Sequence, residues 1–174
     1  MRKFLVSAAV AVLLGACSPP AQDTAETPAP PPTMIACNAL SPNAARQVAV
    51  GEEVVAAAAA SDLRGGSIAP GAYDLISATR VGSPTGWMGT RAVALDVGEA
   101  TSGVVTFNWA GAAPGGESDR WTASFTDTPQ PHMTFTCGRM GEVEVDFAAQ
   151  GNGLQLRLPD GANGSLLLTF ERRA

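Results

Sequence analysis

Histidine and lysine are almost absent from this sequence, which contains one of each, His132 and Lys3. Zinc needs several nitrogen or sulfur ligands, and a Ser–His–Asp triad would depend on His132, which follows two prolines in the stretch PQPHMTF. The stretch 111–116, GAAPGG, lacks the lysine and hydroxyl residue of a phosphate-binding loop. The sequence therefore predicts no catalytic residues, no metal, no cofactor and no enzymatic activity.

Basic residues in general are few and scattered. Eleven Lys and Arg stand against sixteen Asp and Glu, which gives a formal net charge of −5, and no basic run exists. Because proteins that bind nucleic acid carry a clustered basic footprint, we expect no nucleic-acid partner.

A long hydrophobic run is missing as well. The apolar stretch 4–14, which follows Arg2 and Lys3, is shorter than the roughly 20 residues that a membrane-spanning helix needs. A basic start followed by a short apolar run is typical of a secretory signal peptide.

The signal peptide ends in a motif that fixes the expected location. Leu14-Gly15-Ala16-Cys17 resembles the lipobox of bacterial lipoproteins. The resemblance implies that residues 1–16 are removed and that Cys17 carries diacylglycerol and an acyl chain such as palmitate on its new amino group. Ser18 after the cysteine, in lipoproteins of enteric type, implies the outer membrane. We expect a lipid-anchored protein of the cell envelope that faces the periplasm; the alternative is an ordinary signal peptide with a chance cysteine.

The next segment, 18–34, is rich in proline and has no aromatic residue. It cannot bury enough apolar surface to offset the entropy lost on ordering. In polyproline II geometry it would reach about 50 Å. We therefore expect a lipidated cysteine with a disordered stalk over 17–34 and a folded domain over 35–174.

The folded domain begins with a predicted helix and continues with predicted strands. Residues 41–64 favour a helix, with Ser41 as cap, Pro42 in the first turn and many alanines, although Gly51 weakens the pattern. From residue 71 the apolar residues alternate with polar ones, as in half-buried strands. Eight segments show this alternation: 73–80, 91–97, 104–109, 120–125, 133–137, 142–147, 154–158 and 166–170.

Short turns between these segments favour antiparallel neighbours. The sequence predicts an eight-stranded antiparallel up-and-down barrel or a compact sandwich, preceded by one short helix, with the barrel preferred because closure removes exposed edges. The order and size of the segments are similar to small lipocalin-like bacterial barrels. Seven aromatic residues share the inward positions, which favours a filled interior: Phe107, Trp109, Trp121, Phe125, Phe135, Phe147 and Phe170.

Cys37 and Cys137 remain once Cys17 is assigned to lipid. In an exported, oxidising setting an even pair predicts one disulfide. Free thiols or a metal pair are the alternative, but the sequence has no Cys-x-x-Cys spacing.

Two surface features are candidates for binding. The loop 82–89, GSPTGWMG, carries Trp87 and Met88 between glycines, which would suit either a contact surface or a Trp87 plug for one end of the barrel. Glu142, Glu144 and Asp146 share one face of a strand, which suits calcium or acid–base chemistry, but a solvated outer face explains them more simply.

These observations predict a non-enzymatic, lipid-anchored domain that binds another envelope or secreted component. One alternative is a periplasmic protease inhibitor that inserts an N-terminal residue such as Met34 or Ile35 into the protease cleft, as similar small barrels do. The other alternative is a carrier of a small apolar ligand.

Overall fold

The computed structural model describes residues 36–53, 63–116 and 118–174, all within one compact unit, Met34–Ala174. The described residues form strands and turns and contain no helix. The prediction of a mainly β protein is therefore confirmed. The predicted signal peptide, Cys17 and the stalk lie outside the described residues.

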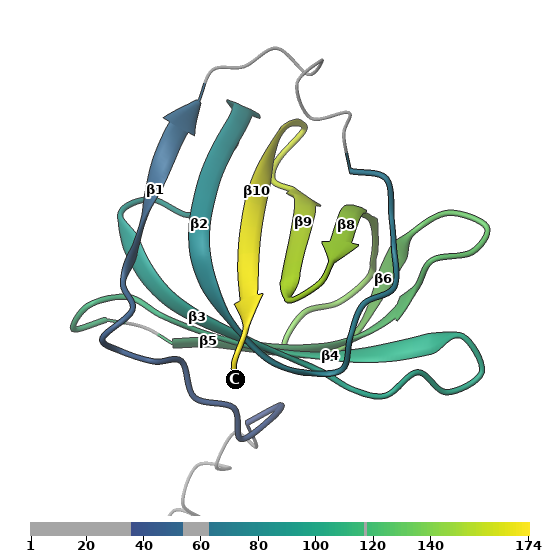
Figure 1. The fold of residues 1–174 in the computed structure, drawn as a ribbon. Helices are drawn as coiled ribbons and strands as arrows, with labels where there is room; N and C mark the ends of the chain where they lie inside the picture. The colour runs from purple at the N-terminus through teal and green to yellow at the C-terminus, as the bar shows by residue number, and fades with distance from the viewer. Residues whose placement is uncertain (1–35, 54–62, 117) are drawn as a thin grey trace, which may run out of the picture. The chain divides into compact units, whose positions relative to one another are not determined.

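The strands form one curved sheet (Figure 1). Their order across the sheet is β7-β6-β5-β4-β3-β1-β2-β10-β9-β8. Among the described strands, β1 and β2 run parallel, and the other neighbours pair antiparallel, as the short turns predict. The strands are β1 (Val48–Glu53), β2 (Gly71–Ser83), β3 (Thr90–Val97), β4 (Val104–Ala112), β5 (Ser118–Thr126), β6 (His132–Cys137), β7 (Glu142–Glu144), β8 (Asp146–Gln150), β9 (Gly153–Pro159) and β10 (Asn163–Arg172).

The helix predicted for residues 41–64 is wrong over 41–53, where the chain makes a turn and then forms β1. β1 enters the space between β2 and β3, because it pairs with β2 through Val50 and with β3 through Val48. Both valines pack against the hydrophobic core, so cross-strand pairing outweighs the helix propensity of the nearby alanines. Residues 54–62, which hold most of those alanines, lie outside the described residues.

The two edges of the open sheet are joined by a single residue. The edge strands β7 and β8 are consecutive in the chain and are separated by Val145 alone. β7 pairs with β6, whereas β8 pairs with β9, so the segment 142–147 changes partners at Val145. The Val145 N–H donates to the Pro131 carbonyl, and β7 also contacts β9.

The concave face of the sheet holds the core. Phe107 and Phe125 stack with their ring centroids 5.1 Å apart, and Phe147 meets Phe125 edge-on. Six of the seven aromatic residues predicted to point inward are buried, and the seventh, Phe135, is partly buried and packs against them. The prediction of one inward apolar face along these strands is confirmed.

Candidate functional site

A cavity of about 170 Å³ lies at one end of the sheet. We call it the tryptophan cavity, because its wall contains Trp87, Trp109 and Trp121, which are all the tryptophans of the sequence. The loop between β2 and β3, the turn between β6 and β7 and the turn between β9 and β10 complete it. The charged part of its wall consists of Arg91, Asp119, Arg139 and Asp160.

Strand alternation positions two of the three indoles. Trp109 of β4 and Trp121 of β5 are paired across the sheet, and their rings stack with centroids 5.1 Å apart. Trp87 comes from the loop between β2 and β3 and meets Trp109 edge-on at 6.4 Å. All three side chains are buried, so they form a rigid aromatic wall.

Asp119 is the polar centre of the cavity. Its carboxylate accepts hydrogen bonds from Trp109 Nε1 at 2.9 Å and from Arg91 Nη1 at 3.2 Å, and Arg139 Nη2 lies 3.8 Å away. The partner of Asp119 across β4 and β5 is Gly111, where any side chain would collide with the carboxylate. The glycine therefore leaves the space in which this charge-assisted network forms.

Asp160 holds the loop that carries Trp87. Both of its carboxylate oxygens accept the Gly86 N–H at 2.9 Å, and Oδ1 also accepts the Thr85 hydroxyl at 3.3 Å. These bonds tie the β2–β3 loop to the β9–β10 turn. Met88, next along the loop, is 72% exposed.

Arg139 forms the outer part of the wall. Its guanidinium lies 5.7 Å from the ring centroids of both Trp121 and Phe135, within cation–π distance. Half of its side chain is exposed, and the next residue, Met140, is 95% exposed. Met88 and Met140 are exposed and directly follow the cavity-lining residues Trp87 and Arg139 in the sequence; these two methionines are called the methionine rim below.

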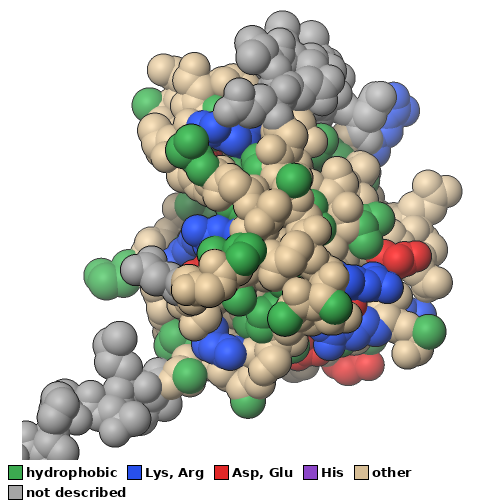
Figure 2. Space-filling view, turned by 90° about the vertical axis from the view of Figure 1, so that its left-hand side faces the viewer, with side chains coloured by type: hydrophobic (Ala, Val, Ile, Leu, Met, Phe, Trp, Pro, Cys, Tyr) green, Lys and Arg blue, Asp and Glu red, His purple; other side chains and the backbone are tan. Residues whose placement is uncertain are grey.

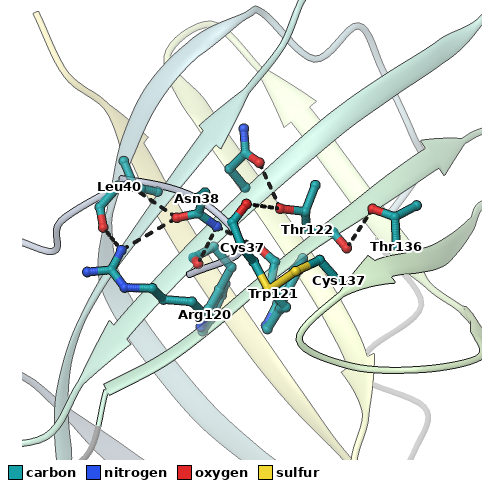
Figure 3. The surroundings of a disulfide bond; sticks show 10 residues. Cys37, Asn38, Leu40, Arg120, Trp121, Thr122, Thr136 and Cys137 are labelled. Atoms are coloured by element: carbon teal, nitrogen blue, oxygen red, sulfur yellow. Dashed lines mark hydrogen bonds between the residues drawn. A yellow bond between two sulfur atoms is a disulfide. The ribbon is translucent and has the colours of Figure 1, made fainter. Parts of the chain in front are cut away.

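A disulfide precedes the turn that carries Arg139. Cys37 is bonded to Cys137, as the sequence predicts, two residues before Arg139 (Figure 3). Gly138 follows the disulfide at a φ of 75°, and a side chain there would collide with the Arg120 carbonyl. The bond therefore fixes the start of the turn that carries Arg139.

Polar contacts fasten the first described residues alongside the disulfide. The Asn38 amide donates to the backbone carbonyls of Trp109 and Trp121 at 3.1 and 3.0 Å. Arg120 donates to the Leu40 carbonyl (Figure 3). These bonds hold the first described residues against β4 and β5.

The predicted binding pair, Trp87 and Met88, separates in the structure. Trp87 is 9% exposed and belongs to the core cluster, which agrees with the interpretation of this residue as a plug, whereas Met88 is exposed. The loop is therefore a cavity wall on one side and a surface on the other. Met34 and Ile35, the residues of the inhibitor hypothesis, lie outside the described residues.

The acidic row of the sixth predicted segment, Glu142, Glu144 and Asp146, lies on the outer surface. Asp146 forms an ion pair with Arg157 at 2.7 Å, and Glu142 lies 3.7 Å from His132 Nε2. His132 starts β6, at the end opposite Cys137. These residues are therefore separate from the tryptophan cavity, as expected for a solvated face.

The four charged residues of the cavity were not predictable as a site. Asp119 lies in strand β5, Asp160 and Arg139 lie in turns, and no motif links them in the sequence. The one available signal is that all three tryptophans occur within 35 residues, from 87 to 121. The spacing of the tryptophans does not reveal how the strands are aligned with one another. This alignment brings the four charged residues together.

Surface patches, metal sites and membrane-spanning helices are features that could indicate a further function elsewhere in the described structure. Basic and hydrophobic side chains are interspersed in Figure 2, and neither kind forms a broad block on that face. In the described ranges, no group of three or more His, Cys, Asp or Glu could hold a metal ion. Likewise, no helix in this part of the chain is long and apolar enough to cross a membrane.

Comparisons with known proteins give no match for this chain, whether with protein-family models, with curated proteins or with solved structures.

Proposed function

We propose that this protein is a lipid-anchored, non-enzymatic binding protein of the bacterial cell envelope. The tryptophan cavity is the part that binds another envelope or secreted component. The observation that carries this proposal is the gathering of all three tryptophans, with two arginines, around one cavity, two of whose lining residues are followed in the sequence by exposed methionines. Tryptophan, methionine and arginine are enriched where proteins bind partners.

The two carboxylates of the cavity already accept hydrogen bonds from the protein, which favours a binding role over a catalytic one. Asp119 accepts hydrogen bonds from an indole and a guanidinium, and Asp160 accepts bonds from Gly86 and Thr85. A carboxylate whose oxygens already accept hydrogen bonds from fixed donors is less available to contact a substrate. Both residues act here as structural anchors of the wall.

The carrier alternative has less support than binding at the cavity. The interior between the strands is occupied by large buried side chains, among them Phe107, Leu95 and Leu156. The cavity at the end of the sheet has room for one small group, about the size of a cavity that holds benzene. This favours recognition of part of a partner over enclosure of a whole lipid.

Closure of the sheet into a barrel belongs to the same proposal. β7 and β8, the edge strands, are parts of one chain segment that is interrupted only at Val145. A closed barrel has no free edge and holds its end loops at fixed positions. Such rigidity would keep the cavity preformed for its partner.

The anchor is tested at Cys17. We expect Cys17→Ser to leave an unprocessed precursor and to lose labelling by a fatty-acid analogue, because the serine cannot receive the diacylglycerol thioether. Cys37→Ser is the matched control and should keep its label. Normal processing of the Cys17→Ser protein would contradict the lipoprotein proposal.

The binding role is tested by photocrosslinking in intact cells. A photoreactive phenylalanine analogue at position 140 should give a discrete crosslinked product, because Met140 lies exposed next to the cavity residue Arg139. The same analogue at Val104 is the control: this residue is 38% exposed and starts β4, whose other end reaches the cavity. Absence of a product specific to position 140 would contradict the proposed role.

A further inference from the structure

The wall of the tryptophan cavity has more hydrogen-bond donors than acceptors. Its two carboxylates are already engaged, Asp119 by Trp109 and Arg91, and Asp160 by Gly86. Three buried donors have no acceptor among the described residues: Trp87 Nε1, Trp121 Nε1 and Arg91 Nε. Trp87 is 9% and Trp121 is 1% exposed. A buried donor without an acceptor is costly, and such a group calls for an explanation in function.

The guanidinium groups add to this surplus. Asp119 lies between Arg91 at 3.2 Å and Arg139 at 3.8 Å, so one carboxylate serves two cations. Arg139 meets Asp119 only at the longer distance, and its side chain is half exposed. Its planar group is held near the rings of Trp121 and Phe135. A guanidinium positioned in this way is suited to bind a planar oxyanion by donating two parallel hydrogen bonds to it.

The volume and the apolar surface of the cavity indicate which chemical group is attached to the oxyanion. The volume of about 170 Å³ is close to the roughly 150 Å³ of a cavity that binds benzene. Leu158, Leu166 and Leu168 add apolar surface to the wall beside the indoles. The ligand group that fits is therefore a carboxylate attached to one compact apolar or aromatic group.

We infer that the tryptophan cavity binds the carboxylate of an aromatic or apolar acid, with Arg139 as the principal contact. This inference rests on the proposed binding role of the cavity and names its ligand chemistry. The carboxylate can come from a free small acid or from the C-terminus of a peptide chain, because both present the same planar group. In either case the apolar part lies against the indoles.

Intrinsic fluorescence tests this inference directly, because every tryptophan of the protein lies in the cavity wall. The mature protein is titrated with 3-phenylpropionate and with its amide, and separately with acetyl-Gly-Phe and with its C-terminal amide. We expect a saturable change with at least one acid and an affinity for the matching amide about tenfold or more weaker, since a hydrogen bond to a charged group is lost. A response to 3-phenylpropionate identifies a free acid as a sufficient ligand. A response to acetyl-Gly-Phe identifies the C-terminus of a peptide as a ligand.

A matched pair of arginine variants supplies the control. Arg139→Gln should weaken binding of the acid about tenfold or more. Arg46→Gln should leave it unchanged, although Arg46 is also half exposed and also lies 3.8 Å from an aspartate, Asp74. The inference is overturned if neither acid gives a saturable change, if acid and amide bind equally, or if Arg139→Gln binds as well as the unaltered protein. Equal binding of acid and amide would leave the proposed binding role standing, because that role fails only in the crosslinking experiment.

Discussion

Phe107→Ala is expected to lower the free energy of unfolding by about 3–5 kcal/mol, the cost of removing a large ring from a packed core. The Phe107 side chain is fully buried and stacks on Phe125 across β4 and β5. The surrounding strands are paired on both sides, so they cannot collapse into the space that the ring leaves. Equilibrium denaturation by urea measures the change.

The neighbouring residue provides the control for this substitution. Thr106 lies on the opposite face of β4 and is exposed. Thr106→Val keeps a β-branched side chain and should change stability by less than about 0.5 kcal/mol, as surface substitutions do. A change of that small size at Phe107 would mean that the inward and outward faces of the strand are exchanged.

Removal of the disulfide is the other change with a large expected effect. The Cys37→Ala/Cys137→Ala double variant should lose up to about 4.7 kcal/mol, because a cross-link across about a hundred residues restricts the unfolded chain. Denaturation of the double variant beside the oxidised protein measures the loss. Alkylation of the unreduced, denatured protein should find neither cysteine free.

Removal of the disulfide should also change the conformation of the turn that carries Arg139. Cys137 precedes this turn, so the double variant should show altered tryptophan fluorescence before it unfolds, because Arg139 lies over Trp121. Unchanged stability of the double variant, or a stoichiometric free thiol in the unaltered protein, would contradict the structural role assigned to the bond.

The strands were largely predictable because their signal is local. Residues such as Val105, Phe107 and Trp109 alternate with polar neighbours, and a half-buried strand needs no distant information to be recognised. β1 was missed because its preference is not local. Val48 and Val50 stand beside an alanine-rich stretch, and only pairing with β2 and β3 makes the extended form the stable one.

The residues of the tryptophan cavity were likewise predictable only where their signal in the sequence is local. The alternation in β4 and β5 predicts that Trp109 and Trp121 point inward, and the even pair of cysteines predicts the bond next to Arg139. The position of Asp119 opposite Gly111, by contrast, follows from the register between β4 and β5. The contact between Asp160 and Gly86 joins two turns that are 74 residues apart. Such contacts depend on how the strands pair and align with one another, and they have no signature in the sequence.

The crosslinking yield at the methionine rim, relative to that at Val104, tests the central claim most directly. If the tryptophan cavity is the recognition site, intact cells should give a discrete product from position 140, a product of the same size from position 88, and none from position 104. Both rim positions follow residues that line the cavity, whereas Val104 starts β4 at its other end. Equal products from all three positions, or no product from position 140, would contradict the account.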